Sequence, residues 1–476
     1  MLPGSMQQRR GKGEMAKEVV IIGGGISGIF VLKNLLAKKD EVKEGLHVTL
    51  LKREKSGWVS VCGLPYALRR WYEIDKTEIN KPQFFIDQGV DFRTETEAVQ
   101  ISVEERMVTL DTSEVLSYDY LVIATGRKPS VPAVVAEAKL EGVYTLNNEA
   151  DARKIEAAMN KEGMKHAFVR GRGINGLQAA VAFATKGLKT TVLGGPPSLL
   201  PSGLDPDMGD MVKEWLEKKG IRFILEHKPL TALKGDGGRL KSVVVGDEEI
   251  PADIAVIAIG AEPNTKLASN AGIDVGAHGG IITDKVMHVQ RSGCPIANVY
   301  ALGDCVEVID GITHRSRLSQ YASTAVVQAK IIADNILGEL TGRPELYSSY
   351  EPCLSPSVAD ISGLLVGSVG VTTEAARMAG IKTISGKATK LIKARYFPGA
   401  SSLTLKLIFD AYTTKVLGAQ MVGEATVAER VNEFTVAIRA GITARELRTM
   451  ERSFDPSLAQ LVDVTIDAAE NALGLL

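Results

Sequence analysis

Cys62 is the residue of this sequence whose type and setting most favour redox chemistry. It lies in the segment SVCGLPY at 60–66, after a predicted strand at 47–51, and the residues GLPYALRR at 63–70 are predicted to open a helix with a proline in its first turn. A helix N-terminus stabilises a thiolate, so the pKa of Cys62 is expected to be lowered and its sulfur to be nucleophilic at neutral pH. The alternative is a small buried apolar side chain.

The other three cysteines, Cys294, Cys305 and Cys353, have weaker settings for chemistry. Cys305 follows an aspartate but has no helix start of its own, and Cys294 and Cys353 belong to no chemical motif. Four cysteines in a chain of 476 residues provide no disulfide framework, and none forms a CxxC pair or a zinc-like cluster. The sequence therefore predicts no metal site and a reducing compartment.

Two glycine motifs of the form GxGxxG could bind the pyrophosphate groups of two dinucleotides. Each follows a predicted strand, precedes a predicted helix and has a further apolar run about twenty residues later, which is the setting that this motif requires. Backbone amides there can approach a pyrophosphate at a helix N-terminus. The residues predicted to bind nucleotides are Gly23, Gly25, Ile26, Ser27 and Gly28 in the first motif and Gly171, Gly173, Ile174, Asn175 and Gly176 in the second.

The elements that must position these motifs alternate between apolar runs and amphipathic stretches. Runs that favour strands precede both glycine motifs and recur at 47–51, 119–123, 189–193, 252–257 and 298–302. This alternation predicts two units, each a parallel sheet covered by helices. From about residue 344 the pattern changes to predicted strands within 363–371, 383–397, 403–410 and 415–422, followed by predicted helices within 425–441 and 442–450, which indicates an α+β unit.

The composition excludes several classes of protein. With 45% apolar residues, 24% charged residues and a net charge of -1, the chain has the balance of a soluble globular protein rather than of a nucleic-acid-binding one. No apolar run approaches the roughly 18–20 residues of a membrane span, and the first residues lack the apolar core of a signal peptide. We expect a cytoplasmic protein with no membrane or nucleic-acid partner.

Together with three further motifs, these features resemble the FAD-dependent pyridine nucleotide-disulphide oxidoreductases from Val19 to the C-terminus. The further motifs are ATGRKP at 124–129, its counterpart AIGAEP at 258–263, and YALGDC at 300–305. The resemblance implies that Gly303 and Asp304 meet the flavin ribityl chain, whose hydroxyl groups a carboxylate can bind. It also implies nucleotide binding by Ala98, Ala124, Thr125, Gly126, Gly260, Tyr321 and Ala322.

Within this family the sequence is similar to the single-cysteine branch. It lacks the CxxxxC pair of glutathione reductase and lipoamide dehydrogenase, and its last histidine is His314, far from the C-terminus where those enzymes place an acid–base histidine. The branch contains coenzyme A disulfide reductases, NADH oxidases, NADH peroxidases and related sulfur or persulfide reductases. The resemblance implies FAD beside Cys62, hydride from NADH or NADPH, and onward transfer of electrons to that sulfur.

The choice among these activities depends on the state of the Cys62 sulfur. A mixed disulfide would lead to disulfide or persulfide reduction, whereas a sulfenic acid would lead to reduction of peroxide or oxygen. NADH peroxidases and similar oxidases carry a histidine in the first glycine motif, where this chain has Ile26 and Ser27. We therefore favour reduction of a coenzyme A disulfide-like compound or persulfide. The alternatives are an NADH oxidase or peroxidase, a reductase of a small redox protein, and a flavoprotein whose cysteine is silent.

Both ribose-binding positions depart from the usual pattern. In the FAD unit Lys52 replaces the usual acid, so Glu54 or backbone groups near Arg53 must serve the ribose. In the nicotinamide unit Gly194 occupies the corresponding position, which leaves the preference between NADH and NADPH open. Gln178 also replaces a glutamate common among relatives.

The resemblance to coenzyme A disulfide reductases also implies a homodimer in which tyrosines of the partner's C-terminal domain reach the site. Tyr396 matches one of them and could protonate a leaving thiolate, whereas Phe454 stands in place of the other. Coenzyme A is a candidate ligand, and a basic set near the predicted entrance could attract its phosphates or simply form a solvated face. This set comprises Lys33, Lys38, Arg69, Arg70, Lys76 and Lys81.

The predicted fold class is α/β, with two Rossmann-like dinucleotide-binding domains and a C-terminal α+β dimerisation domain. The predicted limits are 1–17 for a disordered extension, 18–130 with 280–343 for a discontinuous FAD domain, 131–279 for the NAD(P)H domain, and 344–476 for the dimerisation domain.

Overall fold

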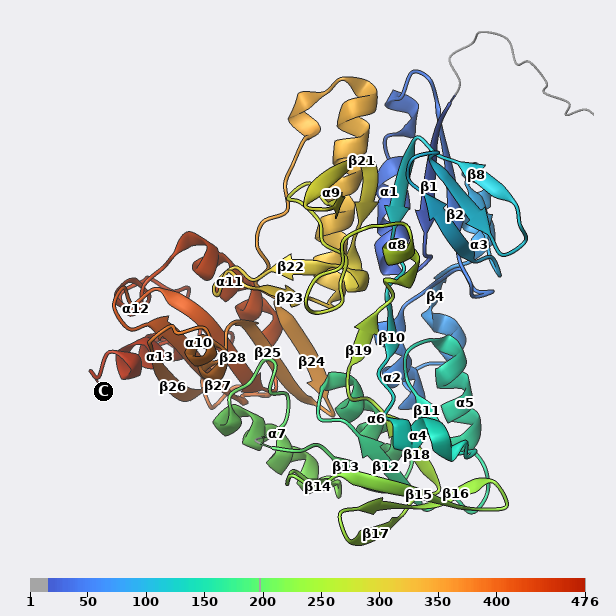
Figure 1. Cartoon of the computed structure of the whole chain (residues 1–476). Coiled ribbons are helices and arrows are strands. Elements are labelled where there is room, and N and C mark those ends of the chain that lie inside the picture. Colours follow the sequence, from blue (N-terminus) through green and yellow to red (C-terminus); the bar gives the residue numbers. More distant parts are fainter. Residues whose placement is uncertain (1–15, 197, 476) are drawn as a thin grey trace, which may run out of the picture.

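A six-stranded sheet forms the centre of the first unit (Figure 1). The computed structural model describes residues 16–196 and 198–475. The sheet order is β20-β21-β9-β1-β2-β5, and all neighbours are parallel except the antiparallel pair β20 and β21. The strands are β1 (Lys17–Ile22), β2 (Leu46–Leu51), β5 (Asp91–Arg93), β9 (Tyr120–Ile123), β20 (His288–Arg291) and β21 (Cys294–Ala301).

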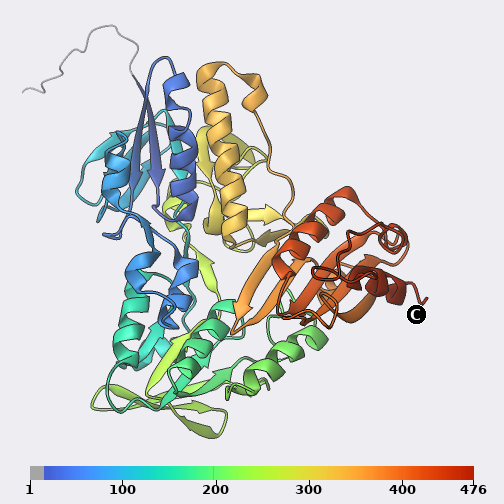
Figure 2. The same ribbon diagram turned by 180° about the vertical axis from the view of Figure 1, so that it is seen from behind.

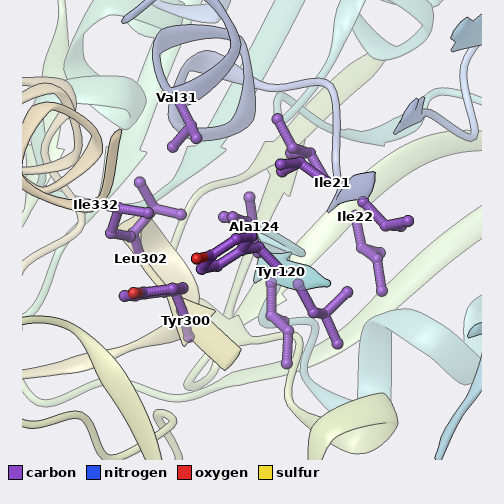
Figure 3. Close-up of a cluster of buried hydrophobic side chains, with 14 of the residues drawn as sticks. Ile21, Ile22, Val31, Tyr120, Ala124, Tyr300, Leu302 and Ile332 are labelled. Carbon is purple, nitrogen blue, oxygen red and sulfur yellow. The ribbon is translucent and has the colours of Figure 1, made fainter. Parts of the chain in front are cut away.

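Two helices pack against each other and against the sheet of this unit. Helix α1 (Ile26–Leu36) packs along α9 (Ala322–Thr341), although almost three hundred residues separate them in the chain. Figure 3 shows how Val31 of α1 and Ile332 of α9 gather with Ile21, Tyr120 and other side chains of the sheet into one buried cluster. The apolar runs that predicted parallel strands are therefore buried on both faces.

Smaller elements complete the first unit. They are β3 (Trp58–Val59), β4 (Glu78–Asn80), the meander β6 (Ala98–Ser102), β7 (Met107–Leu110) and β8 (Val115–Ser117), the pair β22 (Glu307–Ile309) and β23 (Ser316–Leu318), and the short helices α2 (Leu64–Leu68), α3 (Pro82–Ile86) and α8 (Lys266–Asn270).

The second unit contains a five-stranded sheet that is parallel throughout, in the order β11-β18-β12-β13-β14. Its strands are β11 (Val143–Thr145), β12 (His166–Arg170), β13 (Lys189–Leu193), β14 (Arg222–Ile224) and β18 (Ile254–Ile257), and its helices are α4 (Ala133–Ala138), α5 (Glu149–Met159), α6 (Ile174–Thr185) and α7 (Pro206–Glu217). An antiparallel sheet of β15 (Leu230–Asp236), β16 (Arg239–Val245) and β17 (Glu248–Pro251) lies at its end.

The chain crosses between these two units twice, and both crossings lie in one two-stranded ribbon. β10 (Arg127–Pro129) leaves the first unit, β19 (Ala261–Pro263) returns to it, and the two strands pair antiparallel. Beyond the ribbon, the Thr125 hydroxyl donates to the Asn264 carbonyl over 2.6 Å, and the Asn264 side-chain amide donates to the Thr125 carbonyl over 3.0 Å. These bonds fix the ATG loop, which follows β9, against the returning strand.

The third unit is an antiparallel sheet in the order β24-β25-β28-β27-β26. It contains β24 (Ser357–Ile361), β25 (Leu364–Gly370), β26 (Thr383–Leu391), β27 (Ser402–Asp410), β28 (Val416–Gly423) and the helices α10 (Thr373–Met378), α11 (Val427–Ala440), α12 (Ala444–Leu447) and α13 (Val464–Ala472). Figure 2 shows this unit beside α7 of the second unit, where Lys406 and the buried Asp205 form an ion pair of 2.9 Å. The predicted fold class, two dinucleotide-binding units and an α+β unit, is confirmed.

Two sequence predictions concern the ends of the chain and membranes. The predicted extension at 1–17 lies outside the described residues except for Ala16 and Lys17, and Lys17 already belongs to β1. The other predicted domain limits remain predictions, although α8, which packs in the core of the first unit through Ala268, lies within the predicted NAD(P)H domain 131–279. Within the described ranges, no helix is both long and apolar enough to span a bilayer.

Candidate active site

The first glycine motif forms a tight turn with an open side. A Cβ atom on Gly23 would overlap the carbonyl oxygen of Ala124, and one on Gly28 would overlap that of Gly23, so both positions bring backbone segments into direct contact. A Cβ on Gly25 would meet no atom within 4 Å. The turn is therefore packed against backbone at Gly23 and Gly28, whereas its face at Gly25 is open.

This open face fits the pyrophosphate of FAD. Gly25 is the N-cap of α1, its side is open, no side chain caps the helix, and the first turn contains no acidic residue. The first-turn amides, including those of Ile26 and Ser27, are left for a ligand, and the helix dipole favours an anion there. The predicted FAD-binding role of this motif thus agrees with the space and the donors that the structure provides.

The loop with Gly303 and Asp304 lies directly against the first motif. A Cβ on Gly303 would overlap the hydroxyl oxygen of Ser27, and the Gly303 amide donates to the Gln328 side-chain oxygen over 2.8 Å. Gln328 is fully buried on α9, whose N-terminus carries Tyr321 as N-cap and Ala322 as first residue, with no side-chain cap. The structure therefore brings the two predicted FAD-binding segments together. Gln328 escaped the sequence analysis because a helical glutamine has no distinctive motif.

Cys62 lies in a 3-10 turn (Val61–Gly63) immediately before α2. Its side chain is exposed to solvent. The turn is held by the Gly63 amide, which donates to the Ser60 carbonyl over 3.0 Å, and by the Tyr72 hydroxyl, which donates to the Gly63 carbonyl over 3.0 Å. The predicted helix is thus present, but it spans only five residues and begins two residues after the thiol.

The expected lowering of the Cys62 pKa is wrong for this chain. Burial raises the pKa of Cys62, the Arg127 guanidinium lowers it and the Asp304 carboxylate raises it, and the net shift is upward. The sulfur reaches solvent on one side, but the surrounding protein outweighs a helix as short as α2. Arg127 and Asp304, the two charged groups that act on the Cys62 thiol, form an ion pair of 3.2 Å with each other. Arg127 belongs to the ATGRKP motif, yet its proximity to Cys62 follows only from the tertiary fold.

Arg127→Gln is expected to raise the pKa of Cys62 further. The substitution removes the guanidinium that stabilises the thiolate. We expect the pH midpoint of Cys62 alkylation by iodoacetamide, followed by mass spectrometry, to move to higher pH than in the wild type. Lys128→Gln is the matched control, since Lys128 pairs with Glu262 over 3.3 Å and should leave the midpoint in place. A midpoint that stays or falls in Arg127→Gln would contradict this electrostatic role.

The predicted ribose end of the FAD unit is built around Lys52. Lys52 is 7% exposed, and its ammonium group pairs with Glu54 over 3.1 Å. Burial raises the pKa of Glu54, but Lys52 and neighbouring groups lower it, and the net result is a pKa below the usual range of a glutamate. Glu54 is thus ionised and partly exposed, as an acceptor for ribose hydroxyls must be. Arg53 points to Glu97 over 3.5 Å, and Ala98 is buried in the core at the start of β6.

The second glycine motif repeats the geometry of the first. A Cβ on Gly171 would overlap the carbonyl oxygen of Ala258, and a Cβ on Gly176 would lie 2.6 Å from the carbonyl oxygen of Gly171. A Cβ on Gly173 would meet no atom within 4 Å. Gly173 is the uncapped N-cap of α6, which starts with Ile174 and Asn175. Gly260 also faces open space at the end of β18. The open turn fits a second pyrophosphate, and Gly194 lies beside it at the end of β13.

The basic set that was predicted near the entrance is divided among other contacts. Arg69 is 9% exposed, pairs with Asp360 of β24 over 3.2 Å and stacks over Tyr66 and Trp71. Lys38 pairs with Asp334 over 3.3 Å. Arg69 therefore joins α2 to the third unit. A separate hydrogen bond, from the Gln178 amide to the Tyr66 hydroxyl over 3.0 Å, joins α2 to α6 of the second unit.

Tyr396 lies far along the chain from this site, in the loop between β26 and β27. It is 74% exposed and packs against Phe397, with ring centres 5.0 Å apart. Its hydroxyl group makes no hydrogen bond to any residue in the described ranges. Cys305 and Cys353 are buried, and Cys294 is exposed on β21. Cys62 is thus an exposed thiol near the segments predicted to bind FAD.

Comparison with known proteins matches both parts of the chain to one family. The sequence model described as pyridine nucleotide-disulphide oxidoreductase covers residues 17–329, and the model of that family's dimerisation domain covers residues 358–464.

Individual relatives cover nearly the whole length. An NADH oxidase of Methanocaldococcus jannaschii is 32% identical over 95% of this chain and 98% of its own. An NAD(P)H coenzyme A polysulfide/persulfide reductase of Pyrococcus horikoshii is 28% identical over 95% of this chain and 97% of its own. The solved structure of an NAD-dependent persulfide reductase from A. fulgidus superposes with a TM-score of 0.88 and 30% identity, covering 96% of this chain and 83% of that one.

Proposed function

Because the chain belongs to the pyridine nucleotide-disulphide oxidoreductase family, whose members use FAD and a nicotinamide nucleotide, we propose that it reduces a low-molecular-weight disulfide or persulfide through Cys62. The observation that carries this proposal is the place of Cys62. Cys62 is exposed, the Arg127–Asp304 ion pair acts electrostatically on its thiol, and Asp304 belongs to the loop that touches the first glycine motif.

In the proposed reaction Cys62 binds the substrate sulfur covalently, and FAD connects it to the nicotinamide nucleotide. FAD, when bound, accepts a hydride from NAD(P)H and supplies an electron pair to sulfur. Cys62, as a thiolate stabilised by Arg127, attacks one sulfur of the substrate, so that a Cys62–substrate disulfide forms and one thiol leaves. The electron pair restores the Cys62 thiolate and releases the second thiol. In sum, NAD(P)H, a proton and one disulfide give NAD(P)+ and two thiols.

A coenzyme A disulfide or persulfide is the substrate class that we propose first. The relatives named as a coenzyme A polysulfide/persulfide reductase and as a persulfide reductase support this choice. Ile26 and Ser27 in the first motif, where a peroxidase-like enzyme would carry a histidine, support it as well. The chain's four free thiols suit the reducing cytoplasm in which we place this enzyme.

An NADH oxidase is the second candidate, because the relative from M. jannaschii bears that name at 32% identity. In that activity oxygen would take two electrons and two protons from one NADH and a proton to give peroxide, which would oxidise the Cys62 thiol to a sulfenic acid with release of one water. A second NADH and a proton would return the sulfenic acid to the thiol with release of another water. The exposed side of Cys62 admits such a small oxidant as readily as a disulfide.

Anaerobic turnover distinguishes the two candidates. NADH and NADPH oxidation by the purified holoenzyme should be stimulated by coenzyme A disulfide or by a coenzyme A persulfide, and free thiol should appear in the ratio of two per nucleotide for the disulfide. Parallel assays supply glutathione disulfide, hydrogen peroxide or oxygen. If only peroxide or oxygen supports turnover, the reductase proposal is wrong and the oxidase remains.

We also propose that the enzyme is a homodimer in which Tyr396 of one copy completes the site of the other. Exposed apolar side chains lie on the segment 454–462 of the third unit, and this segment packs on the loop of Tyr396 through the Ala394 amide, which donates to the Pro456 carbonyl over 3.0 Å. The family's dimerisation domain covers this region. The exposed set comprises Tyr396, Phe454, Leu458, Leu461 and Val462.

The double variant Leu458→Asp/Leu461→Asp should convert the dimer to monomers. Both side chains are more than 70% exposed in one chain, and two carboxylates buried in a dimer interface would be strongly unfavourable. Analytical ultracentrifugation should show the loss of the dimer, and disulfide reduction should fall at least about tenfold while bound FAD is retained. Val436→Asp, equally exposed on α11 but outside this set, is the control. A dimer that persists in the double variant would place the interface elsewhere.

A further inference from the structure

The position that normally distinguishes NADH from NADPH carries no carboxylate in this chain. In a dinucleotide-binding unit, an acid at the end of the second strand binds the ribose 2′-hydroxyl of NADH, whereas a nearby arginine accommodates the 2′-phosphate of NADPH. Gly194 occupies this position after β13. A Cβ atom there would lie 2.7 Å from a methyl carbon of Leu225 and 3.0 Å from the Cβ of Arg172, so any larger side chain at this position would require the Leu225 side chain to move.

Two arginines reach this same point from the neighbouring strand and from the glycine motif. Arg170, the last residue of β12, donates through Nη1 to the carbonyl oxygens of Leu193 and Gly194 over 3.1 and 3.2 Å. Arg172, inside the second motif, donates through Nη1 to the carbonyl of Gly195 over 2.7 Å and also to those of Pro196 and Ser198. Both side chains are half-buried.

The charge of these two guanidiniums is not neutralised by the protein. All their partners named above are backbone carbonyls, which orient a guanidinium but carry no net charge. Among residues 16–196 and 198–475, neither arginine forms an ion pair with a carboxylate. The nearest acid that follows β14, Glu226, is held by Lys228 over 2.6 Å. Desolvation and, for Arg170, the neighbouring Arg172 lower the pKa of these arginines, as expected for cations without an anion.

We infer that Arg170 and Arg172 form a binding site for the 2′-phosphate and that the enzyme selects NADPH over NADH. The inference rests on the proposed use of a nicotinamide nucleotide at the second glycine motif. One Nη1 of each guanidinium fixes its place at the end of β13, which leaves the other N–H groups for phosphate oxygens, and Arg binds phosphate through such paired donors. The NADPH pyrophosphate would lie at the open face of Gly173.

Calorimetric binding of adenosine 2′,5′-bisphosphate and of AMP to the holoenzyme tests this inference without turnover. We expect the bisphosphate to bind at least about tenfold more tightly than AMP, since a charge-assisted bond to one phosphate is worth about that factor. Arg170→Gln and Arg172→Gln should each reduce this ratio severalfold, and the double variant should abolish it, while the affinity for AMP stays unchanged. Arg239→Gln, an exposed arginine of the same unit, should leave the ratio intact.

Three results would overturn the inference. The first is equal binding of the two ligands by the wild type. The second is an unchanged ratio in both glutamine variants. The third is binding of neither ligand, which would also remove the nicotinamide nucleotide from the proposed function, whereas the first two would leave that function standing.

Arg172 also supports the loop after β13, so a lysine variant separates the two roles. Arg172→Lys keeps the charge but cannot bridge several carbonyls. If its bisphosphate-to-AMP ratio lies between those of the wild type and Arg172→Gln, the charge binds the 2′-phosphate. If the lysine and glutamine variants instead lose affinity for AMP and bisphosphate alike, Arg172 only holds the loop and its part in the inference is wrong.

Discussion

Cys62→Ser is expected to lower NAD(P)H-dependent disulfide reduction at least about a thousandfold, because serine cannot form a thiolate or a mixed disulfide. Hydride transfer to FAD does not involve this sulfur. Reduction of ferricyanide, which takes electrons directly from a flavin, should therefore remain within about twofold of the wild type. Spectrophotometric assays of the same preparation with both acceptors provide the comparison.

Cys294→Ser is the matched control for this result. Cys294 is also an exposed thiol of the first unit, but it lies on β21 in the pair with β20. Its replacement should leave both activities unchanged. Full disulfide reduction by Cys62→Ser would refute the proposed role of the cysteine, and equal loss of both activities would indicate that the flavin site itself was damaged.

Alanine at Gly28 is expected to lower stability and alanine at Gly25 to leave it unchanged, while both changes weaken FAD binding. At Gly28 the new methyl group would overlap the Gly23 carbonyl, so the turn must move, with a loss of about 1–3 kcal/mol or more in folding free energy and loss of FAD. At Gly25 the backbone is in a conformation open to any residue and a methyl group meets only open space, so the fold should survive. That methyl group would nevertheless occupy the face proposed for the pyrophosphate.

Bound flavin and thermal unfolding distinguish these two changes. Gly25→Ala should keep the melting temperature of the flavin-free protein but bind FAD at least about tenfold more weakly, whereas Gly28→Ala should lower both. The second motif supplies the control, because Gly173→Ala alters the equivalent open face of the other unit and should leave FAD content unchanged. Full FAD affinity in Gly25→Ala would show that the phosphates do not lie against this face.

Local sequence signals were sufficient for the parts of this site that depend on neighbouring residues. The glycine motifs predicted helix starts, which the structure has at Gly25 and Gly173, because a turn between strand and helix is encoded within a few positions. The predicted helix within 425–441 likewise corresponds to α11. The apolar runs at 119–123 and 189–193 correspond to buried strands for the same reason.

Contacts between distant segments could not be predicted in this way. The pKa of Cys62 depends on Arg127 and Asp304, which the fold brings together from two other loops, and their effect with burial exceeds that of the adjacent helix. The sequence places Arg69 in a basic set near the predicted entrance, yet in the structure it is buried and pairs with Asp360 of the third unit. Arg172 was visible in the second motif, but only the structure shows that its side chain reaches the end of β13.

The insertion of the second unit into the first has a consequence for biosynthesis. Strand β9 is buried along its whole length between β1 and β21, and β21 follows β9 in the chain by about 170 residues, so it is synthesised much later. Until then β9 is an unpaired apolar edge, which is prone to associate with other chains. The contiguous second unit can complete its own sheet during this interval. The flavin-binding unit, although it begins at the N-terminus, is thus the later of the two to finish folding.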